Sequence, residues 1–160
     1  MTKEEFYANL EQEGFTLEEI NDMLDIVNNI EDNNLTKKQA YALLKTQKPR
    51  DVNAILSLAY YEEKNKAFDM IYSLESSLMR NAIRAFRKAL CENTVEDFVK
   101  NYKSRDFVFL EFIIQEDSSI TDLDDKYLYI SELKYLDGEL DCAIPEIKNR
   151  KLTLPNLDEK

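Results

Sequence analysis

The chain has 160 residues, a net charge of −11 and no histidine, with only two glycines and three prolines. The lack of histidine excludes Ser-His-Asp and Cys-His catalysis and histidine metal ligation, and two distant glycines exclude a glycine-rich phosphate loop. Apolar residues make up 44% of the chain, which suffices for a core, and the length predicts a single domain over residues 1–160.

No apolar run approaches the roughly 20 residues that span a bilayer, and the acidic N-terminus lacks the layout of a signal peptide. Cys91 and Cys142 each stand without a CxxC partner, so neither a disulfide framework nor a zinc site is indicated. We therefore predict a cytoplasmic protein that contacts no membrane and uses no metal or cofactor.

The charge is unevenly spread along the chain. Residues 1–35 carry one lysine against ten acidic residues, whereas residues 36–50 carry five basic residues and no acidic one. Residues 93–160 carry nine basic against sixteen acidic residues. An acidic surface disfavours nucleic acids as partners and favours a protein with a basic surface. It leaves the oligomeric state open.

The first two predicted helices begin with the same capping pattern. Thr2 is followed by Glu5, and Thr16 by Glu19, which is the spacing of a capping box. Gly14 is placed to end the first helix. Apolar residues at helical spacing continue the second helix until residues 31–34 (EDNN) break the pattern.

Further helices are predicted over residues 36–104. Thr36 begins a short helix that Pro49 ends, and Asp51 caps the segment after it. Residues 51–92 contain neither glycine nor proline, and they fit one long helix or two helices with a break near Asn65. Thr94 begins another short helix. The predicted apolar face of the long segment consists of Phe68, Tyr72, Met79, Phe86 and Leu90.

The character of the sequence changes after residue 104. Residues 105–116 fit a buried strand or a buried helix, and their many β-branched and aromatic residues favour the strand. Asp137-Gly138 between two apolar runs indicates a β-hairpin, and residues 151–155 add a short strand. The competing interpretation makes residues 123–136 a helix that ends at Gly138.

The predicted fold is therefore α+β and mainly α. A helical bundle of about five helices occupies residues 2–104, a small antiparallel hairpin or sheet occupies residues 105–155, and residues 156–160 form a frayed tail.

Acidic residues on the first two helices are the main candidate for a binding surface. They either contact a basic site on a protein partner, imitating nucleic-acid phosphates, or are simply solvated. The candidates are Glu4, Glu11, Glu18, Asp22 and Asp25, and the same acidic face extends to Glu31 and Asp32.

A second candidate is a basic ridge within residues 51–92. Arg80, Arg84 and Arg87 fall within about 60° of each other on a helical wheel. Such a ridge could bind a phosphate backbone, but in a chain of net charge −11 pairing with the acidic segments is the favoured explanation. The aspartates of the sequence TDLDD at 121–125 resemble the start of a calcium loop, but the glycine and the final glutamate of that motif are absent.

These features predict a non-enzymatic, inhibitor-type accessory protein that acts by protein–protein contact. Its small size, acidity and Lys-, Asn-, Ile- and Tyr-rich composition are typical of phage- or mobile-element-encoded proteins. One alternative is a structural component of a larger assembly, joined by strand addition at residues 107–114 or at the hairpin. A further alternative is a nucleic-acid-binding regulator that uses the arginine ridge.

Overall fold

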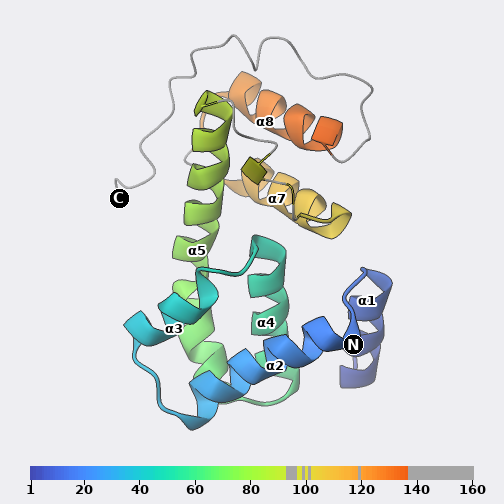
Figure 1. Ribbon diagram of the computed structural model, residues 1–160, viewed down its shortest axis with the longest axis vertical. Helices are drawn as coiled ribbons and strands as arrows, with labels where there is room; N and C mark the ends of the chain where they lie inside the picture. Colours follow the sequence, from blue (N-terminus) through green and yellow to red (C-terminus); the bar gives the residue numbers. More distant parts are fainter. Residues whose placement is uncertain (93–96, 99, 101, 119, 137–160) are drawn as a thin grey trace. The chain divides into compact units, whose positions relative to one another are not determined.

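The computed structural model describes residues 1–92, 97, 98, 100, 102–118 and 120–136, and these contain seven helices and no strand (Figure 1). The chain divides into two compact units, residues 1–78 (unit 1) and residues 79–160 (unit 2), and the division falls within the fifth helix. The helices are α1 (Lys3–Gln12), α2 (Leu17–Asp32), α3 (Lys37–Leu44), α4 (Pro49–Tyr61), α5 (Asn65–Glu92), α7 (Ser104–Glu116) and α8 (Leu123–Leu136).

The described part of the chain is all-α, so the predicted β character of residues 105–116 is wrong. This segment forms α7, and residues 123–136 form α8, as the competing interpretation had it. Phe107, Leu110 and Ile114 are the buried apolar residues of α7, and their spacing of three and four is helical. The predicted hairpin at residues 137–138, the strand at residues 151–155, the tail and the helix start at Thr94 lie outside the described residues.

The predicted starts of α1 and α2 and the predicted end of α1 are confirmed. The Thr2 side chain accepts the Glu5 N–H, and Thr16 and Glu19 form a complete capping box with distances of 3.0 and 3.1 Å. Gly14 ends α1 with a φ of 97°, and the Phe15 N–H bonds the Leu10 carbonyl at 3.0 Å. This is a Schellman ending, whose left-handed residue glycine adopts without a steric penalty.

Of the two alternatives for residues 51–92, the structure has the two helices, with the break just before Asn65. Glu63 takes a φ of 58°, and the Lys64 N–H bonds the Ala59 carbonyl at 2.9 Å, so α4 ends in the same way as α1. However, α4 already begins at Pro49, so Asp51 lies in its first turn and does not cap it. Proline suits the first helical position because its missing N–H would have no partner there.

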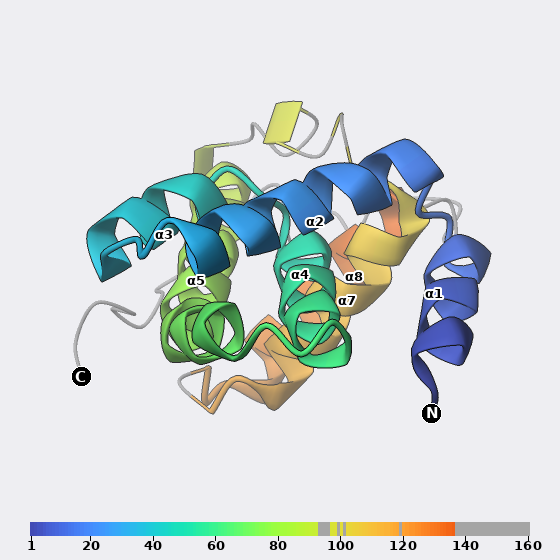
Figure 2. The same ribbon diagram turned by 90° about the horizontal axis from the view of Figure 1, so that it is seen from below.

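Unit 1 is built on the crossing of α2 over α4 (Figure 1, Figure 2). The α2 side chains Met23, Val27 and Ile30 are buried, as are Ile55 and Leu58 of α4. α1 joins α4 through stacked rings of Phe6 and Tyr61, whose centroids lie 4.6 Å apart. The first turn of α5 is held by α2, because the Glu31 carboxylate accepts the Ala67 N–H at 2.8 Å.

The predicted apolar face of α5 agrees only in part with the face that the structure buries, because Phe86 is buried whereas Tyr72 is exposed. In unit 1 the buried residues of α5 are Ala67, Ile71, Leu74 and Leu78, whereas Tyr72 is 66% exposed. Tyr72 lies about 100° around the helix from Ile71. The prediction gave the large aromatic residues more weight than the alanine and isoleucine that pack.

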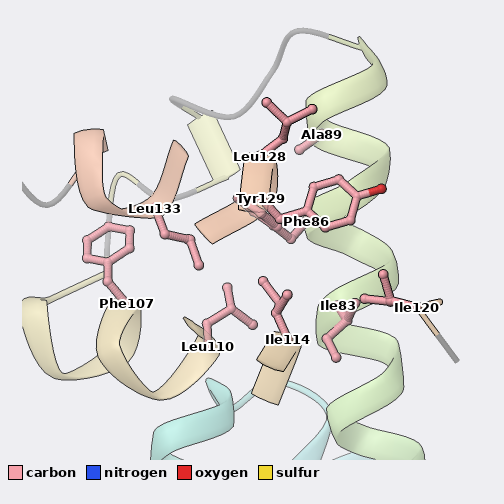
Figure 3. Packing of buried hydrophobic residues seen from close by; sticks show 10 residues of the cluster. All are labelled: Ile83, Phe86, Ala89, Phe107, Leu110, Ile114, Ile120, Leu128, Tyr129 and Leu133. Carbon is pink, nitrogen blue, oxygen red and sulfur yellow. The ribbon is translucent and has the colours of Figure 1, made fainter. Parts of the chain in front are cut away.

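Unit 2 has its own apolar core, formed by the second half of α5 with α7, α8 and Ile120 (Figure 3). Phe86 and Tyr129 are fully buried between α5 and α8, and α7 packs along α8. The core residues are Ile83, Phe86, Ala89, Phe107, Leu110, Ile114, Ile120, Leu128, Tyr129 and Leu133.

Candidate functional site

The acidic residues predicted on α2 form one stripe on its exposed side. Glu18, Asp22 and Asp25 are exposed and fall within about 60° of each other around the helix. They lie opposite the side that packs on α4, to which Met23 and Val27 belong. Among the described residues, no side chain forms a hydrogen bond or ion pair with any of these three carboxylates. We call Glu18, Asp22 and Asp25 the acidic stripe.

The other two predicted acidic residues, Glu4 and Glu11, are exposed on α1. They lie seven residues apart, on the side of α1 opposite the buried Phe6 and Leu10. Neither has a side-chain partner among the described residues. The structure therefore brings together three of the five candidates on α2 and two on α1, and no contact joins the two sets.

Other acidic residues of unit 1 are used in internal contacts. Glu13 pairs with Arg50, whose guanidinium also lies 5.3 Å from the ring centroid of Phe15. Glu62 pairs with Lys3 at 2.9 Å. Glu31 caps α5 as described above. Glu13, Glu31 and Glu62 therefore have structural contacts, whereas the carboxylates of the acidic stripe have no side-chain partner among the described residues.

The contacts of Glu62 shift its pKa. Burial acts to raise its pKa, but hydrogen bonds from Tyr7 and Lys3 oppose that effect. The positive charges of Lys3 and Lys64 add to them, so the pKa of Glu62 is lowered overall. The pKa of Tyr7 is raised, first by burial and then by its hydrogen bond to Glu62 and that residue's charge. Lys3 and Tyr7 belong to α1 and Glu62 follows α4, so these contacts hold α1 against the end of α4.

The arginine ridge is not a continuous exposed surface. Arg80 is exposed, whereas Arg84 is half-buried and donates a hydrogen bond to the Asn81 side chain at 2.8 Å. Arg87 is only 2% exposed, and its guanidinium carbon lies 5.5 Å from the ring centroid of Tyr129. Arg87 thus belongs to the interior of unit 2, where its guanidinium makes a cation–π contact with Tyr129.

Of the aspartates in the segment 121–125, Asp122 has a structural role. Asp122 Oδ1 accepts the N–H groups of Asp124 and Asp125, at 2.8 and 3.3 Å, and so caps the start of α8. Over the described residues, no group of three or more histidine, cysteine or acidic side chains has an arrangement that could hold a metal ion.

A pocket of about 350 Å³ opens in unit 1 beside the end of α2. Ile30 and Met70 supply apolar surface, while Lys37, Lys66 and Asp69 bring two positive charges and one negative charge to its walls. The opposing charges favour no single class of ligand, and the pocket does not suggest a function.

Comparison of the chain with protein-family models, curated proteins and solved structures found no match. In the part of the chain that the structure describes, no helix combines the length and apolar character needed to span a membrane. The exposed carboxylates of α1 and α2 therefore remain the feature from which a function can be argued.

Proposed function

We propose that the protein is a non-enzymatic, inhibitor-type binding protein whose acidic stripe occupies a basic, nucleic-acid-binding site on a protein partner. The observation that carries this proposal is the exposure of Glu18, Asp22 and Asp25 on one side of α2, without a side-chain partner in the described structure. Like charges held side by side cost stability. A binding role gives a reason for keeping them.

The spacing of the acidic stripe supports the proposal. Glu18 and Asp25 are separated by seven residues, which corresponds to about 10 Å along a helix that rises about 1.5 Å per residue. A nucleic-acid strand carries one phosphate charge per roughly 3.4 Å, or about three charges over the same length. The stripe therefore matches one strand in linear charge density, on a rigid helix anchored by its capping box and its packing on α4.

The proposal is tested by affinity capture from host cells with a stripe variant, Glu18→Gln/Asp22→Asn/Asp25→Asn. We expect the unmodified protein to retain a basic partner that is released by rising salt and by added duplex DNA or RNA. The stripe variant should retain at least tenfold less of this partner.

The matched control for capture is Glu92→Gln/Asp97→Asn/Glu116→Gln, which removes three exposed charges from unit 2. It should retain the partner as the unmodified protein does. Equal loss in both variants would show that only net charge matters, and retention that is insensitive to salt and nucleic acid would refute the proposal.

A further inference from the structure

Two exposed tyrosine rings of unit 1 and a half-buried phenylalanine ring between them form a contiguous surface at the junction of α4 and α5. Tyr60 is 62% exposed and Tyr72 is 66% exposed, with the ring of Phe68 between them. The centroid of Phe68 lies 6.0 Å from each neighbour, and it is stacked on Tyr72 with an interplanar angle of 22°. We call Tyr60, Phe68 and Tyr72 the aromatic patch.

The core of unit 1 does not account for this patch. α5 packs through Ala67, Ile71 and Leu74, all of which are buried, and Tyr72 lies on a different side of the helix. Single exposed aromatic residues are ordinary, but adjoining exposed rings more often mark a contact surface. Among the described residues, neither the Tyr60 nor the Tyr72 hydroxyl has a hydrogen-bond partner.

Charges of both signs lie near the aromatic patch, because Lys64 and Lys66 stand in the same stretch of chain as two exposed carboxylates. Asp69 is exposed and lies three residues before Tyr72 on α5, so the two side chains are neighbours on the helix surface. Glu63 is exposed in the turn that follows Tyr60, and its N–H bonds the Tyr60 carbonyl at 3.1 Å. Neither carboxylate has a side-chain partner in the described residues.

Rings flanked by free carboxylates have the chemistry that binds cations. An aromatic face attracts positive charge, and a guanidinium stacks on it while its N–H groups reach a carboxylate. A lysine ammonium is more strongly hydrated and lacks the planar shape, so it gains less from a stacked ring. We infer that the aromatic patch is a second docking surface, which takes arginine side chains of a basic protein partner.

This inference rests on the proposed function, because it assumes a basic partner, and it adds the side chain that the partner presents. The acidic stripe attracts lysine and arginine alike, whereas the aromatic patch favours arginine. The two surfaces therefore leave different signatures in a comparison of the two cations.

The test uses fluorescently labelled octa-arginine and octa-lysine peptides, titrated with the full-length protein and followed by fluorescence anisotropy. We expect the unmodified protein to bind octa-arginine about three- to fivefold more tightly than octa-lysine. Tyr60→Ala/Tyr72→Ala should bring the ratio of the two dissociation constants to about one. Tyr60→Phe/Tyr72→Phe keeps the rings and should keep the preference. Circular dichroism checks that the variants are folded.

The outcomes separate the inference from the proposed function. An unmodified protein without a preference for arginine, or a preference that survives the alanine variant, would overturn the aromatic patch as an arginine site and leave the proposed function intact. The stripe variant should weaken binding of both peptides by a similar factor and preserve their ratio. Unchanged binding of both peptides to the stripe variant would instead contradict the proposed function.

Discussion

At the scale of single residues, the contacts of Glu62 show how burial and hydrogen bonding oppose one another. The lowered pKa of Glu62 means that its carboxylate stabilises the fold above the ordinary value of 4.5. That contribution is lost as the pH falls through the lowered pKa. Tyr7 has a raised pKa, so its neutral hydroxyl contributes fully below the ordinary value of 10.0, and this contribution is lost as the pH rises toward the raised pKa.

Tyr7→Phe should lower the free energy of unfolding at pH 7 by about 1 kcal/mol, because one hydrogen bond to a charged group is lost. The variant should also show a smaller loss of stability below pH 4.5 and above pH 10.0 than the unmodified protein, since both pKa shifts depend in part on this bond. Urea denaturation across the pH range measures both effects. Tyr61→Phe, which keeps the ring stacked on Phe6, is the control. A Tyr7→Phe curve parallel to the original would rule out this role.

At the scale of elements, the starts of α1, α2 and α3 were predictable because the chemistry of their threonine caps is local. Thr16 and Glu19 are three residues apart, so a short stretch of sequence contains both residues of the capping box. α7 was missed because its apolar residues surround the helix: Val108 and Phe112 are exposed, while Leu110 is buried. Packing against α8 determines which side of α7 is buried, and the sequence of α7 alone does not reveal that contact.

The same distinction applies to the candidate site. The density of acidic residues in α1 and α2 was visible in the sequence, but which carboxylates are structural was not. The partners of Glu31, Glu13 and Glu62 lie 36, 37 and 59 positions away in the sequence. Arg87 is a similar case, since its burial against Tyr129 depends on how α5 and α8 pack.

The capping of α5 by Glu31 gives a test at this scale. Glu31→Ala should lower the free energy of unfolding by about 1 kcal/mol, because the Ala67 N–H loses its acceptor and the start of the helix loses a nearby negative charge. Asp32→Ala removes an equal charge from the next, exposed position and should change stability by less than about 0.5 kcal/mol. Thermal or urea denaturation compares the two, and equal effects would show that Glu31 acts only through net charge.

At the scale of the whole molecule, the two compact units have separate sets of core residues. Ile55 and Leu58 belong to unit 1, whereas Leu110 and Ile114 belong to unit 2. The acidic stripe and the aromatic patch both lie in unit 1, which carries fifteen acidic and eight basic residues. We therefore predict that both proposed contact surfaces depend on the integrity of unit 1 and not on that of unit 2.

Leu110→Ala and Ile55→Ala form a matched pair that tests this independence, because both side chains are fully buried. Each substitution should cost about 2–5 kcal/mol through lost burial and the resulting cavity. Native-state hydrogen exchange with mass spectrometry should show faster exchange in α7, α8 and residues 79–92 for Leu110→Ala. For Ile55→Ala, faster exchange should appear in α2, α4 and residues 65–78.

The two halves of α5 are the most informative reporters in this experiment. When one unit unfolds, the half of α5 that belongs to it should fray. The fraying should stop where the core of the other unit still holds the helix. If the two units unfold separately at the boundary near residue 78, residues 65–78 should stay protected from exchange in Leu110→Ala. Residues 79–92 should stay protected in Ile55→Ala. Uniform acceleration along all of α5 in both variants would mean that the units unfold together. Octa-arginine binding by Leu110→Ala then tests whether unit 1 alone supports the contact surfaces. If it does, this variant should still bind the peptide.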